Sequence, residues 1–318
     1  MPRRPAASLD VPILVTGGLG FIGGYLVDEL VASGATNIRV FDNGRRAVTP
    51  TENWPREVVS VIDGDIRDIT AVQHATRGCK VVFHLAAQSN VMGAMNDPEY
   101  SCGTNVGGTL NVLSAARDDG AHRVVFTSSR EVYGDIDCLP VPESAALHPK
   151  NLYGASKAAA ELYCRALAGN GLEIAILRLA NVYGPRDRDR VIPIFISNAM
   201  EGVPLTLYGG GQVLDFVWIQ TVVDALLGVG FGDAIPHPLN VGSGVGTTVQ
   251  EVAHRIIESI PSDSKCVYVP TRSLEVTKFV SDMTLAKKYL GLTDVKDPLE
   301  YLDQLIDNKR TQVAPVEY

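Results

Sequence analysis

The chain has 318 residues, of which 46% are hydrophobic and 20% are charged, close to the averages for globular proteins. This composition excludes a disordered, collagen-like or coiled-coil chain, and the length predicts two domains or one large α/β unit. The 28 basic and 36 acidic side chains give a net charge of −8, which argues against nucleic acid as a partner.

The sequence also argues against a membrane partner. No run of apolar residues reaches the roughly 18 that a span requires, and residues 1–10 lack the apolar stretch of a secretory signal, so we expect a cytoplasmic protein. The five cysteines are widely spaced without a C-x-x-C pair, and the six histidines show no metal-ligand spacing. We therefore expect reduced cysteines and no metal site.

Short β-branched runs alternate with longer helical stretches between residues 11 and 178, a pattern typical of βαβ units. The predicted strands cover residues 12–16, 37–41, 58–62, 81–85 and 123–127, and the long helices cover residues 21–33, 101–118 and 152–168. Because the strands are apolar almost throughout, we expect helices on both faces of the sheet. The predicted fold class is α/β, a doubly wound parallel sheet of the Rossmann type.

The pattern changes near residue 180. A charged stretch at residues 186–190 is followed by a short helix, a glycine triplet at 209–211 and mixed short elements. We expect a Rossmann domain over residues 1–180 and a smaller substrate-binding lobe over residues 181–318, some segments of which return to the first domain.

A glycine-rich turn joins the first predicted strand to the first helix. Gly17, Gly20 and Gly23 are spaced G-x-x-G-x-x-G, which allows a tight turn and close approach of a pyrophosphate to the helix N-terminus. Asp42 ends the second strand, where a carboxylate accepts both ribose hydroxyls and repels a 2′-phosphate, so NAD is favoured over NADP. Arg45 and Arg46 close by are the features that would favour NADP. Asp65 is a candidate adenine contact or a solvated loop carboxylate.

Three polar residues form a candidate catalytic set. Tyr153 and Lys157 lie four residues apart on one face of a predicted helix, so their side chains should point together. An ammonium beside a phenol favours the phenolate and lowers its pKa, which would make Tyr153 a general base or acid. Ser129 follows an apolar strand at the sheet edge where open α/β sheets bind ligands. The alternatives are an exposed Tyr/Lys pair and a turn-forming serine.

These motifs together resemble those of an extended short-chain dehydrogenase/reductase. The resemblance spans nearly the whole chain and rests on the glycine turn, Asp42-Asn43, His84-Leu85-Ala86-Ala87, Asn105, the segments 127–134, 153–157, 178–186 and 240–244, and Arg272. Within that superfamily the chain is similar to NAD-dependent nucleotide-sugar epimerases and dehydratases.

The resemblance implies a bound NAD that takes hydride from C4 of a sugar while Tyr153 removes the hydroxyl proton. Ser129 would bind that oxygen, and Lys157 would bind the nicotinamide ribose. Further implied cofactor contacts are Gly17, Gly20, Phe21, Ile22, Asp42, Asn43, Asp65, Ile66, Leu85, Ala86, Ala87 and Asn105. The implied substrate contacts are Ser128, Ser129, Arg130, Asn181, Arg186, Gln212 and Arg272.

The residues after Ser129 bear on which reaction follows the first oxidation. Family 4-epimerases usually carry small or hydroxylated residues there, whereas dehydratases and decarboxylases carry a Glu. This chain has Arg130-Glu131. Glu131 is therefore either a base at C5 or a structural carboxylate paired with Arg130, and Arg130 suits bidentate binding of a uronic acid carboxylate.

Two further features concern substrate. The loop with Arg186, Arg188 and Arg190 resembles that of glucuronate 4-epimerases, although alternation with Asp187 and Asp189 is also typical of a solvated, self-paired run. Leu214 stands where the family usually has an arginine that contacts phosphate, in a segment one residue shorter. The contact between an arginine and the substrate phosphate is then either missing or supplied by Arg186 or another residue.

We therefore expect an NAD-dependent 4-epimerase of UDP-glucuronate or a UDP-hexose that works through a transient 4-keto sugar. The alternatives are a 4,6-dehydratase or UDP-glucuronate decarboxylase using Glu131, and a non-catalytic NAD-binding regulatory protein. In this family the helices at 101–118 and 152–168 pair as a four-helix bundle, which implies a homodimer, although the same apolar faces would also serve to pack on the sheet.

Overall fold

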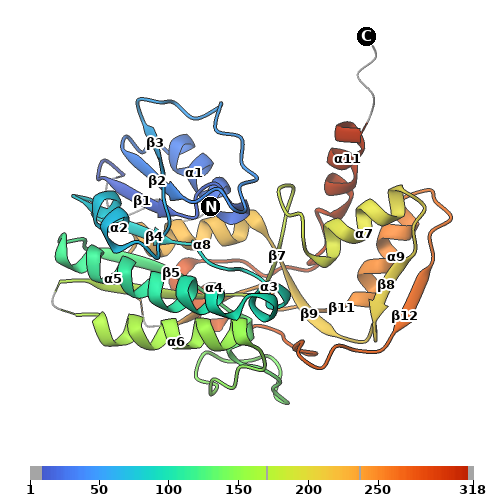
Figure 1. The fold of residues 1–318 in the computed structure, drawn as a ribbon. Coiled ribbons are helices and arrows are strands. Elements are labelled where there is room, and N and C mark those ends of the chain that lie inside the picture. Colours follow the sequence, from blue (N-terminus) through green and yellow to red (C-terminus); the bar gives the residue numbers. More distant parts are fainter. Residues whose placement is uncertain (1–8, 170, 236–237, 314–318) are drawn as a thin grey trace, which may run out of the picture.

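The computed structural model describes residues 9–169, 171–235 and 238–313; the expectations for residues 1–8 and for His237 fall outside them. Seven strands form a parallel sheet in the order β10-β6-β5-β4-β1-β2-β3 (Figure 1). Their bounds are β1 Ile13–Thr16, β2 Ile38–Asp42, β3 Val59–Asp63, β4 Val81–His84, β5 Arg123–Ser129, β6 Glu173–Leu179 and β10 Leu239–Val241. The predicted doubly wound parallel sheet is confirmed.

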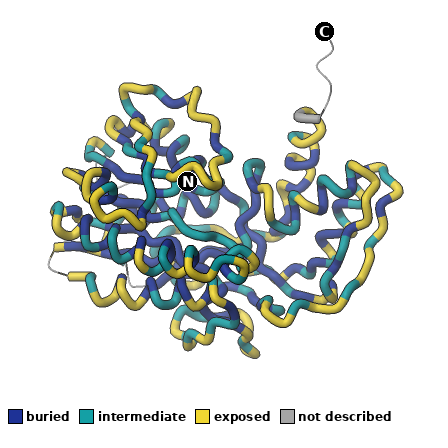
Figure 2. Tube along the Cα trace, viewed as in Figure 1, coloured by how far each residue is buried: buried dark blue, intermediate teal, exposed yellow. Residues whose placement is uncertain are grey.

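Helices cover both faces of this sheet (Figure 1). One layer holds α1 (Phe21–Ala32) and α8 (Ile219–Phe231), and the other holds α2 (Ile69–Thr76), α5 (Thr109–Asp118) and α6 (Leu152–Leu167). Successive strand side chains point to opposite faces, so Ile13 and Val15 pack with α1 while Leu14 packs with α2 and α5. This two-sided burial explains why the strands are apolar at nearly every position, and Figure 2 shows the buried interior that results.

The helix predicted over residues 101–118 is divided in the structure. α3 (Val91–Asn96) and α4 (Pro98–Cys102) lead into a π-helical segment, η1 (Gly103–Gly108), before α5 begins. Gly107 and Gly108 weaken regular helix here, and Gly108 lies so close to Ile66 that a Cβ atom would come within 2.6 Å of its side chain. The widened turn brings Asn105 into the interior, where it is 1% exposed.

A second lobe lies to one side of the sheet (Figure 1). It contains β7 (Asn181–Tyr183), β9 (Val213–Trp218) and β11 (Gly246–Thr248) in one small sheet, and β8 (Leu205–Tyr208) and β12 (Cys266–Val269) in another. Its helices are α7 (Val191–Met200), α9 (Val249–Ser259) and α11 (Leu302–Val313), and α7 and α9 pack on a core of their own.

The chain crosses between the two parts several times. After β7 and β9 it returns as α8, which packs on the central sheet, and as β10, which pairs with β6. The 3-10 helix η2 (Arg130–Val132) follows β5, and α10 (Thr284–Leu290) packs near β10. Within the described ranges, none of the helices combines the length and apolar character needed to cross a membrane.

Candidate active site

A pocket of about 700 Å³ lies at the carboxyl ends of the central strands, where the sheet meets the second lobe. Its walls come from the loops after β1, β2, β4 and β5 on one side and from residues 179–192 on the other. The strand order reverses between β4 and β1, and doubly wound sheets bind ligands at this switch point. The volume is typical of a ligand site.

Most residues predicted for the site line this pocket. They are Gly17, Gly20, Phe21, Ile22, Asp42, Asn43, Ile66, Leu85, Ala86, Ala87, Ser128, Ser129, Arg130, Glu131, Tyr153, Lys157, Asn181 and Arg186. Four predicted residues do not line the pocket, because each is held by another part of the protein. They are Asp65, Asn105, Gln212 and Arg272.

The glycine turn is a cradle that side chains would fill. Gly17 has φ +73°, and a Cβ atom there would come within 2.7 Å of the backbone nitrogen of Ala86. A Cβ on Gly23 would lie 2.2 Å from the carbonyl oxygen of Gly17. Helix α1 begins after Gly20 without a side-chain cap, so its first N–H groups face the pocket as an anion site. This backbone fits the pyrophosphate of a dinucleotide.

Asp42 stands at the end of β2 on the same pocket wall. Its Oδ2 accepts a hydrogen bond from the Leu19 backbone at 3.0 Å and its Oδ1 accepts one from Gly44 at 2.9 Å, which hold the carboxylate in place. Burial raises the pKa of this carboxyl, and the two backbone hydrogen bonds oppose that shift. A fixed carboxylate here fits the ribose hydroxyls of NAD.

The two arginines that would favour NADP line the pocket, and each has a partner within the protein. The guanidinium of Arg45 stacks 3.9 Å from the ring centroid of Tyr100, and Arg46 forms an ion pair with Asp189. Asp65 is held by Arg67 at 2.7 Å and by Asn43 at 3.2 Å, and the hydrogen bonds from Arg67 lower its pKa to about 2. Its neighbours Gly64 and Ile66, rather than its carboxylate, form the pocket wall.

Tyr153 and Lys157 project from the first turns of α6, next to the end of β5. Asn151 caps this helix by accepting a hydrogen bond from the Gly154 backbone at 2.8 Å, which fixes where α6 begins. Lys157 Nζ donates to the carbonyl oxygen of Thr127 at 2.8 Å, and Ser129 hydrogen-bonds to the Tyr153 phenol. The three predicted side chains therefore meet at one place in the pocket.

The expected pKa relationship between Tyr153 and Lys157 is wrong for this structure. Burial raises the pKa of the Tyr153 phenol, and the lowering influences come from Arg190, Ser129 and Arg130. Lys157 instead turns its ammonium to the Thr127 carbonyl, and burial lowers its own pKa from 10.5 to about 8. Arg190 and Arg130 therefore lower the pKa of the phenol against the effect of burial. The spacing of Tyr153 and Lys157 along the helix did not indicate this.

Glu131 is bound on both carboxylate oxygens. Oε1 pairs with Arg130 at 2.9 Å and Oε2 accepts a hydrogen bond from Asn151 at 2.7 Å, and the side chains of Glu131 and Arg130 are 8% and 12% exposed. Arg130 also donates through Nε to Asn181 Oδ1 at 2.6 Å, which turns the amide NH₂ of Asn181 away from Arg130. Arg130 Nη1 is buried without a hydrogen-bond partner among the described residues.

The remaining predicted residues are occupied by the protein itself. Asn105 bonds to both backbone groups of Gln88 and to Ser156 Oγ, so it joins the loop after β4 to helix α6 behind the pocket wall. In the second lobe, Gln212 donates to the Tyr208 carbonyl, and Arg272 stacks 3.6 Å from the Tyr208 ring centroid. Leu214 packs in the core of that lobe at 8% exposure.

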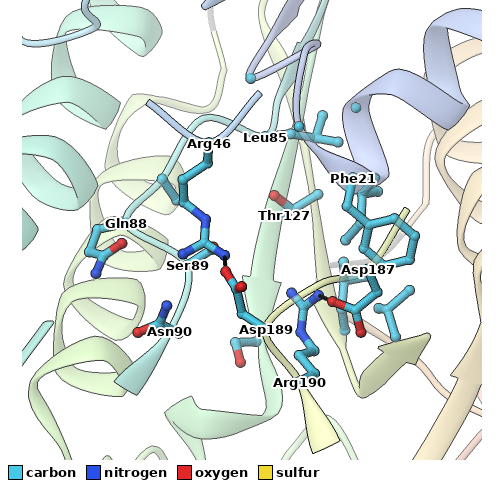
Figure 3. A pocket seen from close by; sticks show the side chains of 18 of the residues that line it. Phe21, Arg46, Leu85, Gln88, Ser89, Asn90, Thr127, Asp187, Asp189 and Arg190 are labelled. Atoms are coloured by element: carbon cyan, nitrogen blue, oxygen red, sulfur yellow. Dashed lines mark hydrogen bonds and ion pairs between the residues drawn. The ribbon is translucent and has the colours of Figure 1, made fainter. Parts of the chain in front are cut away.

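The charged loop at residues 186–190 closes one side of the pocket (Figure 3). Arg186 pairs with Asp28 of α1 at 2.6 Å, and Arg190 pairs with Asp187 at 2.8 Å, whose side chain is 3% exposed. Asp189 pairs with Arg46 across the pocket, as Figure 3 shows. Arg190 and Asp187 pair within the run, as the alternating charges suggest. Arg186 and Asp189 instead pair with residues outside the run, so the run is not simply solvated. Sequence reasoning did not assign Asp189 or Arg190 to the pocket, and only the alternating charge marked them.

In the described part of the chain, no three His, Cys, Asp or Glu side chains gather as a metal site.

Residues 13–242 match the family model described as the NAD dependent epimerase/dehydratase family. The UDP-glucose 4-epimerase of Mycolicibacterium smegmatis is 31% identical over 87% of this chain and 92% of its own length. The UDP-N-acetyl-alpha-D-glucosaminuronate decarboxylase of Bacillus cytotoxicus is 35% identical, covering 81% of this chain and 83% of the relative.

Solved structures agree with the sequence comparison. MoeE5 in complex with UDP-glucuronic acid and NAD superposes with a TM-score of 0.87 at 31% identity, covering 95% of this chain and 100% of that one. The glycine cradle and Asp42 supply the geometry that a dinucleotide needs, and the matched family is defined by its NAD dependence. The chain is therefore an NAD-dependent member of the epimerase/dehydratase family.

Proposed function

We propose that this protein is a nucleotide-sugar 4-epimerase that works through a transient 4-keto sugar. The observation that carries the proposal is the pairing of Glu131 with Arg130 and Asn151 beside a convergent Ser129, Tyr153 and Lys157. Arg130 and Asn151 hold the Glu131 carboxylate by one partner on each oxygen, which favours a structural carboxylate over a base at C5. The remaining residues, Ser129, Tyr153 and Lys157, support proton transfer at a single hydroxyl of the sugar.

In this reaction the Tyr153 oxygen takes the proton of the sugar C4 hydroxyl, and Ser129 holds that oxygen by a hydrogen bond. NAD, when bound, supplies the hydride acceptor at C4. Lys157 keeps its ammonium beside the Thr127 carbonyl, where it would hold the nicotinamide ribose of the bound cofactor. Asn181, with its carbonyl tied to Arg130, offers its NH₂ to an anionic or hydroxyl group of the substrate. After the keto sugar rotates, hydride would return to the opposite face of C4 while Tyr153 returns the proton to the oxygen from the same position.

The charges near Tyr153 support a hexuronic acid sugar as substrate. Arg130 and Arg190 both line the pocket, and both are close enough to lower the pKa of the Tyr153 phenol. A carboxylate suits such guanidinium donors. MoeE5 has been solved with UDP-glucuronic acid and with UDP-glucose, so this neighbour agrees with either sugar. A neutral UDP-hexose is the second candidate, because the Arg130–Glu131 pair has no net charge.

The test is a product analysis of the purified enzyme. UDP-glucuronate, UDP-glucose and dTDP-glucose are each incubated with the protein, and products are resolved by chromatography and mass. We expect a new isomer of unchanged mass from UDP-glucuronate without added NAD, because the cofactor is regenerated in each turnover. Loss of carbon dioxide or of water as the main event would reject the proposal in favour of a decarboxylase or dehydratase using Glu131. No conversion of any substrate would favour a regulatory NAD-binding protein.

We also propose a homodimer formed through α5 and α6. The outer face of α6 exposes large apolar side chains, with Leu162 61%, Leu152 42% and Tyr163 40% exposed. Several large apolar side chains exposed on one helix are typical of an interface. Light scattering of the full chain should give twice the monomer mass, and Leu162→Glu should give a monomer. A monomeric wild-type protein would reject the proposal.

A further inference from the structure

The strands and helices behind the pocket enclose an ion pair that takes no part in the proton transfer described above. Glu161 and Arg178 are both 0% exposed, and Arg178 Nη2 lies 2.7 Å from Glu161 Oε2 while its Nε lies 2.9 Å from Oε1. This bidentate pair joins α6 to β6. Removing two charges from water is expensive, and such a pair is often no more stabilising than apolar side chains of the same size. Its presence directly behind the site therefore calls for a reason other than stability.

The pair is connected to the site through Ser128. Ser128 Oγ donates to Glu161 Oε1 at 2.6 Å, and Ser128 stands opposite Arg178 in the pairing of β5 with β6. Ser128 faces α6 together with Val124 and Phe126, because alternate side chains share a face, and the next residue is Ser129. The hydroxyl of Ser128, which the sequence assigned to substrate, is thus committed to the helix.

Glu161 lies on the same face of α6 as the two catalytic side chains. Tyr153, Lys157 and Glu161 are spaced by four residues, so they form one row along the helix. The row is anchored at its far end by Glu161 on Ser128 and Arg178, and at its middle by Lys157 on the Thr127 carbonyl. Both anchors hold α6 against the end of β5, which carries Ser129.

We propose that the Glu161–Arg178 ion pair is a positioning device, which holds α6 on β5 through Ser128 and so sets Tyr153 and Lys157 relative to Ser129. The inference rests on the proposed role of these three residues in proton transfer. Arg178 also donates to the Tyr133 hydroxyl at 2.9 Å and to the Glu143 carbonyl at 3.0 Å, so its guanidinium is held by the segment after β5 as well as by α6.

The pair also shapes the electrostatics at Lys157. Glu161 is faced by Arg178 from β6, Ser128 from β5, and Lys157, Cys164 and Arg165 from α6 itself. Burial lowers the pKa of Lys157 to about 8, and Glu161 and Cys164 oppose that shift. Without Glu161 the ammonium should lose its proton at a lower pH.

The experiment uses the full chain with NAD and the double variant Glu161→Leu/Arg178→Met, which replaces both charges by apolar side chains and leaves neither unpaired. We expect kcat to fall at least ten-fold while KM stays within two-fold, because the binding surface is kept and the proton-transfer geometry is not. The decline of kcat at high pH should begin at a lower pH than in the wild type. A kcat within two-fold of the wild type, with an unchanged pH profile, would overturn the proposal.

The matched control is Arg123→Met. Arg123 pairs with Glu173 at the opposite end of the same two strands, and it donates to the carbonyls of Val229 and Gly232. Its loss should lower the melting temperature while kcat and the pH profile stay as in the wild type. If this variant loses as much kcat as the double variant, the effect is general destabilisation and the proposal is rejected.

Two further measurements cover an unstable double variant or an inactive wild type. If the double variant does not fold, Ser128→Ala is used instead, because it removes only the hydrogen bond from β5 to Glu161. In this variant kcat should fall at least three-fold with KM unchanged. An unchanged kcat overturns the proposal. Independently of turnover, NMR of ¹³Cε-labelled lysine, assigned with Lys157→Arg, should show Lys157 titrating at lower pH in Glu161→Leu/Arg178→Met. An unchanged midpoint contradicts the inference, whereas a wild type that converts no nucleotide sugar contradicts only the proposed function.

Discussion

Arg46 and Asp189 form an ion pair that joins the loop after β2 to the loop after β7 across the pocket (Figure 3). The first residue belongs to the wall that carries Asp42, and the second belongs to the loop that carries Arg190. The pair therefore links the two parts of the molecule on either side of the cofactor groove. Because the two side chains are 41% and 56% exposed, the link is weak enough to open.

Asp189→Asn should loosen NAD without changing the fold. An exposed pair contributes about 0–1 kcal/mol, so the Kd for NAD should rise by up to about five-fold at low salt. The difference should shrink in about 0.5 M salt, since the pair is screened. Calorimetric titration of NAD at both salt concentrations measures this, with Asp294→Asn, which removes the exposed pair with Lys287, as the control. Equal affinities in wild type and Asp189→Asn at low salt would disprove the link.

Tyr153→Phe should lower kcat by about 10²–10⁴-fold, the usual contribution of a positioned general acid or base. The melting temperature and NAD affinity should stay close to those of the wild type, because only one hydroxyl that bonds to Ser129 is removed. Tyr163→Phe on the exposed face of the same helix is the control and should keep full activity. A Tyr153→Phe enzyme with more than a tenth of the wild-type kcat would show that another group moves the proton.

Lys157 should give stability a recognisable pH dependence. Its pKa is lowered from 10.5 to about 8 in the folded protein, so between these values the unfolded chain binds more protons. The free energy of unfolding contributed by this group therefore rises as pH increases from about 8 toward 10.5, and it is least favourable below pH 8. Urea unfolding of wild type and Lys157→Met at pH 7.5 and 9.5 should show the difference between them shifting in favour of the wild type at the higher pH. A constant difference would mean that Lys157 titrates normally.

Gly23→Ala should abolish NAD binding or folding. Its Cβ would lie 2.2 Å from the Gly17 carbonyl oxygen, so the turn must move away from the start of α1. Gly107→Ala is the matched control, because nothing lies within 4 Å of a Cβ placed there. Circular dichroism and NAD titration of both variants distinguish them. Normal NAD affinity in Gly23→Ala would show that the turn tolerates a side chain.

Glu131→Gln should keep kcat within about ten-fold of the wild type but lower stability by about 1–3 kcal/mol, because Arg130 loses the anion that neutralises it. Thermal melts and the epimerase assay measure the two effects separately. Glu275→Gln, which removes a partner of the more exposed Arg272, should change neither appreciably. A loss of more than 10³-fold in kcat with unchanged stability would identify Glu131 as a base and revive the decarboxylase alternative.

Several features of the site were predictable because they depend on residues close together in the sequence. The turn from Gly17 to Gly23, the position of Asp42 at a strand end, and the row of Tyr153 and Lys157 each follow from the period of one strand or helix. Ser129 was predictable because β5 is apolar up to its hydroxyl-bearing end. The matched family and the parallel sheet confirm the fold that these local patterns predicted.

Other features depend on which distant segments meet, and no local pattern specifies that. Asn105 turns away from the pocket because the π-helical segment directs it to Gln88 and Ser156. Burial raises the pKa of the Tyr153 phenol, and Arg190 and Arg130, which come from two other loops, oppose that rise.

The amino-acid sequence by itself determined the βαβ order, the glycine turn and the placement of Tyr153 and Lys157 on one helix face, since backbone periodicity and glycine conformation act over a few residues. Only the tertiary structure decided that Glu131 pairs with Arg130 and Asn151, that Ser128 donates to Glu161, and that Asp189 reaches Arg46. Electrostatic partners are chosen by distance in space, and burial sets how strongly they act. The distances between these partners and their burial are set only once the sheet and the second lobe have come together.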